Sequence, residues 1–229
     1  TGAERSFESV LQGVRGRRVM EVNAAGSPQR IIEETPPEPG QDIYLTIDLG
    51  VQKVAEKAVR DAIKDANNKG YKANAGSAVA VDVTNGEVLA MASYPTYNPE
   101  DFINGISQET WKKFSSKKSN YPLTNRAISS TYPPASTFKS FTGLTALNYG
   151  LATQNTTFVC RGLWTGLGKQ WGKWCWNHAG HGTENLRKAM MDSCDAYFYE
   201  IGYKAYKSKK ESLQKMARSF GYGSKTGID

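Results

Sequence analysis

The chain lacks any run of about 18 apolar residues, the length at which an apolar segment is typical of a membrane-spanning helix. Its first residues, Thr-Gly-Ala-Glu, do not have the composition of a signal peptide, and the sequence contains no internal repeats. We therefore expect the chain as given to be soluble. Its abrupt start and end would suit a piece of a longer protein whose N-terminal membrane anchor is missing.

Signals for nucleic-acid binding are lacking as well. The formal net charge is +7, but the lysines that produce it are scattered, without an RNA-binding motif or a basic stripe along one helix. We interpret them as solvated surface and predict no nucleic-acid partner, although a basic surface would also suit an anionic membrane or polymer. With 229 residues, 39% hydrophobic and 11% aromatic, the chain can bury a core, which favours one large domain and a small appendage.

The N-terminal part of the chain predicts an appendage, then a strand and a helix. Residues 1–40 have little apolar periodicity and end in a Pro-rich linker. The β-branched and aromatic residues of 43–47 predict a strand. Asp48 can cap a helix that closes at Gly70. The apolar stripe expected to be buried on this helix comprises Val51, Val54, Ala58, Ala62 and Ala66.

The middle of the chain predicts a hairpin and a surface excursion. Residues 76–83 and 88–92 flank the turn residues Asn85-Gly86, a pattern typical of an antiparallel hairpin. Residues 94–125 are rich in Pro, Asn, Ser and Lys and hold one short amphipathic piece around Trp111 and Phe114.

The C-terminal part predicts a loop followed by three helices. Residues 151–183 look like a loop and hold four of the five tryptophans. A short helix over 184–191, capped by Thr183, should follow, then helices through 199–206 and 213–220.

A hydroxyl and an amine lie three residues apart in the segment 132–139, Tyr-Pro-Pro-Ala-Ser-Thr-Phe-Lys. The prolines hold the approach extended, and Phe138, Phe141, Leu144 and Leu147 then recur at the spacing of a buried helix. Ser136 and Lys139 would share one face of that helix. A serine becomes a nucleophile when a nearby base takes its proton, and an amine is a base only when it is kept neutral. An N-capping serine followed by a surface lysine is the alternative.

The triplet Ser193-Cys194-Asp195 lies between two predicted helices, where a short turn can direct side chains into a cleft. By itself the triplet favours a helix cap. In combination with Lys139 and with Ser136, which is 57 residues upstream of Ser193, it resembles the penicillin-binding protein transpeptidases, whose sites pair serine-x-x-lysine with serine-x-asparagine or serine-x-aspartate. The likeness covers nearly the whole chain. Asp195 and Cys194 resemble the monofunctional enzymes of rod-shape elongation, and Ala135, where many relatives have glycine, is expected to be harmless.

The resemblance implies an α+β fold, in which an antiparallel sheet formed by strand 43–47 and hairpin 78–92 packs against helices. Residues 1–40 would be the end of an N-terminal pedestal or dimerisation domain with its linker, and residues 41–229 an incomplete transpeptidase domain. The family would imply a single-pass anchor that is absent here, and a place on the extracytoplasmic face of the bacterial membrane.

The resemblance also implies a D,D-transpeptidase. Ser136 would attack a peptidoglycan stem peptide ending in D-Ala-D-Ala, with Lys139 as its base, and β-lactams would acylate the same serine. Ser193 would relay a proton to the leaving amine, Asp195 would orient the lysine and the substrate, and the Ser136 N–H would supply half of an oxyanion hole. A membrane glycosyltransferase and the elongation complex would be partners. A non-catalytic β-lactam sensor and a serine β-lactamase are the alternatives.

The family's third motif is a lysine-threonine-glycine on an edge strand. The chain contains Lys225-Thr226-Gly227, but only 32 residues past Ser193, where relatives have a non-catalytic segment. We do not assign it to the site, and expect this chain alone to have little or no turnover.

All three cysteines and both histidines fall within 35 residues, which suggests a staple for a Trp-rich loop. The residue types allow a disulfide with a spare thiol, three unrelated buried thiols, or a closed zinc shell of three cysteines and one histidine. The resemblance implies a structural metal site, which we hypothesise holds zinc, with His178 as the alternative nitrogen ligand; its expected ligands are Cys160, Cys175, His181 and Cys194.

Overall fold

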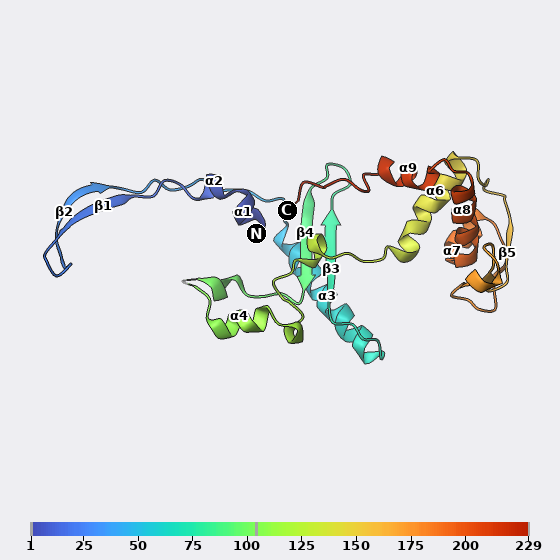
Figure 1. The fold of residues 1–229 in the computed structure, drawn as a ribbon, viewed down its shortest axis with the longest axis horizontal. Helices are drawn as coiled ribbons and strands as arrows, with labels where there is room; N and C mark the ends of the chain where they lie inside the picture. The colour runs from blue at the N-terminus through green and yellow to red at the C-terminus, as the bar shows by residue number, and fades with distance from the viewer. Residues whose placement is uncertain (1, 104, 229) are drawn as a thin grey trace. The chain divides into compact units, whose positions relative to one another are not determined.

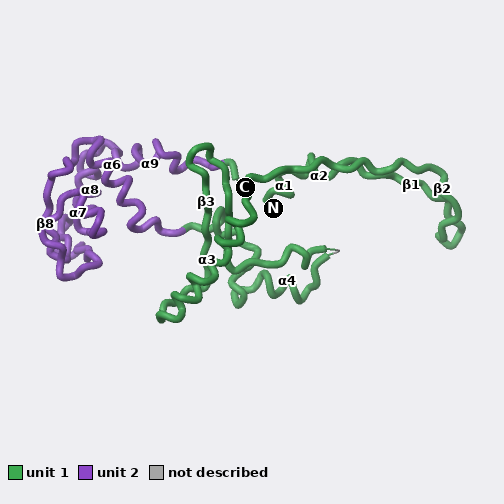
Figure 2. Tube along the Cα trace, turned by 180° about the vertical axis from the view of Figure 1, so that it is seen from behind, with its two compact units in different colours: residues 1–131, 227–229 green, residues 132–226 purple. Residues whose placement is uncertain are grey.

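The computed structural model describes residues 2–103 and 105–228, which form two compact units (Figures 1 and 2). The first unit comprises residues 1–131 and 227–229, and the second comprises residues 132–226. No helix in the described ranges is both long enough and apolar enough to cross a membrane.

The first unit begins with two short helices and a hairpin that lie in the region for which we predicted only an appendage. Its elements are α1 (Gly2–Ser6), α2 (Glu8–Leu11), β1 (Arg17–Val22), β2 (Pro28–Thr35), α3 (Leu49–Asn68), β3 (Gly76–Val81), β4 (Val88–Tyr94), η1 (Pro99–Phe102), α4 (Gln108–Phe114), η2 (Lys117–Ser119) and α5 (Arg126–Ser129).

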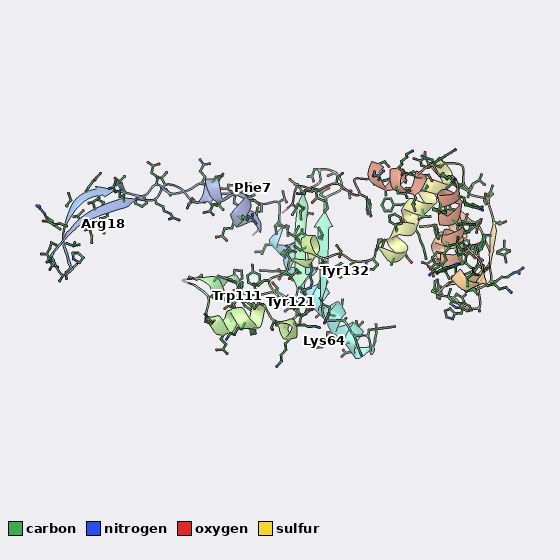
Figure 3. The ribbon with its side chains drawn as sticks, in the orientation of Figure 1. Phe7, Arg18, Lys64, Trp111, Tyr121 and Tyr132 are labelled. Carbon is green, nitrogen blue, oxygen red and sulfur yellow. The ribbon has the colours of Figure 1, made fainter. Side chains whose placement is uncertain are left out.

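The β1–β2 hairpin is held by backbone pairing and by cross-strand ion pairs rather than by a core. Arg18, labelled in Figure 3, pairs with Glu34, and Arg30 pairs with Glu21. Both faces of the hairpin are largely exposed, so its sequence has no strict alternation of apolar and polar residues. That lack of alternation is why the strands could not be found from the sequence.

Helix α3 packs against the β3–β4 hairpin, as Figure 1 shows, and Asp48 caps it by accepting a hydrogen bond from the N–H of Val51 at 2.8 Å. The hairpin and its Asn85-Gly86 turn are confirmed. The predicted buried stripe of α3 is wrong, because Val54 is 68% exposed whereas Val59 is buried. The larger side chains of Val59 and Ile63 face Gly76 of β3, and they decide which face is buried.

The predicted strand over 43–47 is also wrong. The segment runs beside β4 without forming a ladder, because the Thr46 Oγ1 donates to the Val88 carbonyl at 2.7 Å and the next backbone hydrogen bond is Asp48 N–H to Leu89 O at 3.0 Å. Tyr44 is 94% exposed, so this aromatic side chain, which favoured the strand prediction, is not packed on a sheet. The short amphipathic piece around Trp111 (Figure 3) is confirmed as α4.

The second unit has four helices around a small apolar core and two small antiparallel strand pairs. Its elements are η3 (Ala135–Phe138), α6 (Lys139–Asn148), β5 (Phe158–Cys160), β6 (Leu163–Trp164), η4 (Lys169–Trp171), β7 (Lys173–Trp174), β8 (Gly182–Glu184), α7 (Leu186–Met191), α8 (Asp195–Lys207) and α9 (Ser212–Ser219). Helices and antiparallel strands occur together, as an α+β fold requires. The segment 151–183 is therefore not all loop: β5 pairs with β8, and β6 with β7.

Two predictions for the helices of this unit need correction. Helix α7 starts at Leu186 with Asn185 as its cap, since the Asn185 side chain accepts from the N–H of Lys188 at 2.9 Å and Glu184 belongs to β8. The buried face of α6 is also not the predicted Phe138–Leu147 stripe, because Leu144 is 42% exposed. The buried residues of α6 are the small or short ones that allow α8 to approach: Thr142, Gly143, Thr145 and Ala146.

Candidate active site and the neighbouring cysteine-histidine cluster

Ser136 and Lys139 lie one helical turn apart where the single 3-10 turn η3 continues into α6. Ala135, just before the serine, has φ 49°, in the left-handed region that L-residues rarely adopt. This strain corrects the expectation that alanine is harmless here, because glycine adopts such a conformation without strain. Ser136 is exposed, so its hydroxyl is accessible to a substrate.

Ser193 occupies the turn between α7 and α8 and also has a left-handed backbone, with φ 49°. Its N–H donates to the Met190 carbonyl at 3.3 Å, and the N–H of Cys194 donates to the Ala189 carbonyl at 2.9 Å. This tight turn directs the Ser193 hydroxyl toward α6, where it donates a hydrogen bond to the Ser136 Oγ at 2.9 Å. Two serines from distant parts of the chain are thus in direct contact.

The amine of Lys139 is held by three acceptors from the turn that follows α7. Its Nζ donates to the Ser193 carbonyl at 2.8 Å, to the Ser193 Oγ at 3.0 Å, and to the Asp195 Oδ1 at 2.5 Å. The lysine side chain is only 11% exposed and the aspartate 22%. The Lys139 backbone N–H donates to the Ser136 carbonyl, whereas the hydrogen bonds of its amine in the described part of the chain reach the Ser136 hydroxyl only through the Ser193 hydroxyl.

Asp195 lies in the first turn of α8, where a carboxylate is favoured by the helix dipole. Its second oxygen, Oδ2, accepts a hydrogen bond from the backbone N–H of Trp176 at 2.9 Å. Burial, with the nearby charge of Asp195, raises the pKa of Tyr199 one turn along the helix. Asp195 therefore binds the amine of α6 with one oxygen and the Trp-rich loop with the other.

A cavity of about 1000 Å³ opens beside these side chains. Ser136, Lys139 and Asp195 lie along its wall, and the aromatic rings of Trp164 and Tyr203 line it as well. The cavity can hold an extended ligand whose reactive group reaches the Ser136 hydroxyl. Of the four predicted catalytic residues, Ser136, Lys139 and Asp195 line the cavity, and Ser193 is brought to them by its hydrogen bonds with Ser136 and Lys139.

The residues of the predicted metal site also converge, next to the active-site turn. Potential ligand atoms of four residues lie within 4.8 Å of one another: Cys160, Cys175, His181 and Cys194. All three cysteines are buried free thiols in this structure. The pairing of β5 with β8 and of β6 with β7 folds segment 158–184 so that Cys160, Cys175 and His181 come together, and the turn after α7 adds Cys194.

The cluster fits a four-coordinate metal by the chemistry of its donors. The His181 Nδ1 lies 3.6 Å from the Cys175 sulfur, and its Nε2 is buried without a hydrogen-bond partner among the described residues. Such an unpartnered buried nitrogen is costly unless it has a ligand. Three thiols and one imidazole form a common tetrahedral zinc shell. His178, the alternative ligand, is outside the cluster and stacks on Trp174, with ring centroids 4.7 Å apart.

The electrostatics of the thiols are unequal. Burial opposes ionisation of Cys160, but the backbone N–H groups of Gly162 and His181 outweigh it and lower the pKa of Cys160 to about 7. Burial, with the neighbouring sulfurs of Cys160 and Cys175, raises the pKa of Cys194 to about 12. Three thiolates in one buried space repel one another, and a doubly charged cation would stabilise them together.

Two parts of this region were not found from the sequence. Trp176 contacts the active-site turn through its backbone and its indole, and no local motif marks it. Glu184 is fully buried, with Lys188 one helical turn away at 2.8 Å from its Oε1. The contact is an ion pair rather than a hydrogen bond, because its geometry is poorly directed. Neither carboxylate oxygen of Glu184 has a well-directed hydrogen bond in the described ranges. A glutamate beside a lysine at i+4 is common on exposed helices, so the sequence does not distinguish this pair.

The triplet Lys225-Thr226-Gly227 forms no strand in the described part of the chain.

Comparison with known proteins gives matches along the whole chain. A family model of the penicillin-binding protein transpeptidase domain matches residues 76–229, and one of the penicillin-binding protein dimerisation domain matches residues 1–45. The chain is 38% identical over 236 residues to the peptidoglycan D,D-transpeptidase MrdA of Escherichia coli K12; the match covers 100% of this chain and 34% of the relative. The chain thus spans about a third of the length of the curated relatives it matches.

Solved structures agree with this match. A complex between penicillin-binding protein PBP2 and MreC from Helicobacter pylori is similar with a TM-score of 0.71 and 35% identity, covering 99% of this chain and 39% of that one. A chain of a peptidoglycan synthase complex is similar with a TM-score of 0.80 and 35% identity, covering 99% of this chain and 40% of that one. On the strength of the family match, the identity to full-length relatives and the shared fold, the chain belongs to the penicillin-binding protein transpeptidase family.

Proposed function

We propose that the protein carrying this chain is a peptidoglycan D,D-transpeptidase that cross-links stem peptides through a serine acyl-enzyme. The observation that carries the proposal is the hydrogen-bonded connection from the Ser136 hydroxyl through the Ser193 hydroxyl to the Lys139 amine. A nucleophile, a route for its proton and a partly buried amine at the end of that route are the parts that acyl transfer requires. The names of the curated relatives support the same activity.

In this proposal the Ser136 Oγ forms a bond to the carbonyl carbon of the penultimate D-alanine. Its proton passes to Ser193, and Ser193 gives its own proton to Lys139, which acts as the general base in its neutral form. The carbon–nitrogen bond to the last D-alanine then breaks, and the leaving amine takes a proton back along the same route. An amine of a neighbouring stem peptide attacks the ester, forms the cross-link and releases the Ser136 hydroxyl.

Two groups would support this chemistry without transferring protons. The backbone N–H of Ser136, at the start of η3, would donate to the oxyanion of the tetrahedral intermediate. Asp195 would keep the lysine amine directed at Ser193, since its Oδ1 accepts from that amine. β-Lactams would open on the same serine because their strained amide presents the same carbonyl to it.

We propose zinc as a structural cofactor of the cysteine-histidine cluster. Cys160, Cys175, His181 and Cys194 would hold it, and the ion would supply charge to neutralise the thiolates. Cys194 lies between Ser193 and Asp195, so a bound ion would brace the active-site turn without reaching the substrate.

We further propose that residues 1–40 are the end of a pedestal or dimerisation domain with its linker and that residues 41–229 belong to the transpeptidase domain. In the full protein the catalytic domain would lie at the extracytoplasmic face of the membrane, on a single N-terminal anchor, and Lys225-Thr226-Gly227 would not serve as the third motif. The MreC complex and the peptidoglycan synthase complex of the similar structures support partners in the elongation machinery. We propose that a membrane glycosyltransferase is one of these partners.

The test is acylation by a fluorescent penicillin, compared between the full-length protein and its Ser136→Ala variant. We expect stable labelling of the wild type and none of the variant, and turnover of stem peptides by the wild type alone. Deacylation within a second would indicate a β-lactamase instead, and labelling without any cross-linking would indicate a sensor. The isolated 229-residue chain should label poorly; labelling at the full-length rate would show that Lys225 serves after all.

A further inference from the structure

Trp176 makes hydrogen bonds to both sides of the active-site triplet Ser193-Cys194-Asp195. Its backbone N–H donates to the Asp195 Oδ2 at 2.9 Å. Its indole Nε1–H donates to the carbonyl of Asp192, the residue before the triplet, at 3.0 Å. One residue of the Trp-rich loop therefore holds both ends of the segment that supplies Ser193 and Asp195 to the site.

The held segment is strained at its centre. Ser193 has φ 49°, a left-handed conformation that costs on the order of 1 kcal/mol for a residue with a Cβ and persists only where the surroundings fix it. The backbone bonds of Ser193 and Cys194 to α7 fix one side of the turn. The indole bond to the Asp192 carbonyl fixes the chain directly before the strained residue.

The carboxylate of Asp195 connects Trp176 to the Lys139 amine by hydrogen bonds. Its Oδ1 accepts from the Lys139 amine at 2.5 Å while its Oδ2 accepts from the Trp176 N–H. A movement of Trp176 would turn this carboxylate and with it the amine that donates to Ser193. The ring of Trp176 is in turn fixed edge-to-face on His181, with centroids 5.2 Å apart, although its side chain is largely exposed.

We propose that Trp176 is a positioning residue that holds the Ser193–Asp195 turn against Ser136 and Lys139. The expected effect of Trp176 on acylation rests on the proposed function, whereas its stabilisation of the Ser193–Asp195 turn does not. The indole N–H provides a bond that a substitution can remove without removing the aromatic ring. Trp174 is the matched control: it lies in the same loop, is similarly exposed at 54%, and stacks on a histidine, but within the described residues its indole donates no hydrogen bond to the turn.

The experiment compares Trp176→Phe with Trp174→Phe in the full-length protein under saturating penicillin. We expect Trp176→Phe to lower the maximum acylation rate constant about tenfold, with the dissociation constant of the non-covalent complex unchanged. Trp174→Phe should acylate at the wild-type rate. A residue that only stabilised the fold would move the melting temperature or the metal content of the protein, and neither should change in Trp176→Phe.

Hydrogen–deuterium exchange tests the hold on the turn independently of any activity. The amide protons of Ser193 and Cys194 are hydrogen-bonded to α7, so they should exchange faster in Trp176→Phe than in the wild type or in Trp174→Phe. Unchanged exchange, or loss of fold or metal in Trp176→Phe, would overturn the proposal. If the wild type were not acylated at all, the proposed function would fail, and the exchange rates would still decide the role of Trp176.

Discussion

The hydroxyl of Ser193 lies 2.9 Å from the hydroxyl of Ser136, although 57 residues separate them in the sequence. Lys139, only three residues from Ser136, contacts the Ser193 oxygen and is connected to Ser136 through it. The serine of the second motif therefore lies on the hydrogen-bonded route between nucleophile and base, in addition to its predicted role of relaying a proton to the leaving amine. Loss of this hydroxyl should affect the formation of the acyl-enzyme itself.

Ser193→Ala should lower the maximum acylation rate constant of the full-length protein by about 100-fold, because general-base transfer contributes roughly that much or more. The measurement is stopped-flow labelling with a fluorescent penicillin. Ser193→Gly serves as the control for strain: it also lacks the hydroxyl, but glycine accepts φ 49° without cost, so it should be as slow yet more stable. Acylation at the wild-type rate in either variant would exclude the relay.

Substitution of His181 should abolish metal binding, whereas substitution of His178 should not. His181 lies within the cluster with a buried, unpartnered Nε2, and His178 stacks on Trp174 outside it. We expect about one zinc per chain by elemental analysis in the wild type and in His178→Ala, and little in His181→Ala. Because metal binding contributes to folding, His181→Ala should also melt at a lower temperature. Absence of zinc from the wild type, with a Cys160–Cys175 disulfide by mass spectrometry, would contradict the hypothesis.

Ala135→Gly should stabilise the protein by about 1 kcal/mol, because glycine adopts the left-handed backbone at this position without steric cost. The gain should appear as a higher denaturant midpoint. An exposed alanine within α3, Ala58, is the matched control, since Ala58→Gly should destabilise by about 1 kcal/mol through loss of helix propensity. Equal destabilisation by both substitutions would mean that the backbone at Ala135 is not strained.

Lys188→Met should destabilise the protein, since it leaves the fully buried carboxylate of Glu184 without its cation. The contact with Glu184 raises the pKa of Lys188 above its usual 10.5. Because the pKa of Lys188 is higher in the folded than in the unfolded protein, the ion pair stabilises the fold fully at pH values below the unfolded-state pKa. This stabilisation is lost as the pH rises through the folded-state pKa. The difference in melting temperature from the wild type should thus be equal at pH 7 and pH 9 and shrink above about pH 10.5.

The exposed lysine of α9 gives the control for this pair. Lys215→Met removes a charge from the surface and should leave the melting temperature unchanged at every pH. If the difference in melting temperature between Lys188→Met and the wild type grew with pH, the loss of the ion pair could not be its cause.

The sequence by itself determined the features that depend on neighbouring residues. The spacing of Ser136 and Lys139 set both on one turn, Asp48 started α3, and Asn85-Gly86 closed the hairpin, since each depends only on backbone geometry within a few residues. The residue types of the two motifs and of the cysteine-histidine group were enough to indicate the family and to select the candidate site.

Tertiary structure decided which faces are buried and which distant groups meet. Val59 rather than Val54 is buried on α3, because the partner strand and not the helix pattern selects the face. The Ser193 hydroxyl rather than the Lys139 amine makes the hydrogen bond to the Ser136 hydroxyl in the described residues, and Trp176 reaches Asp195, because the turn after α7 is fixed by contacts from elements far away in sequence. Side-chain packing across such separations depends on the whole unit, and no local spacing encodes it.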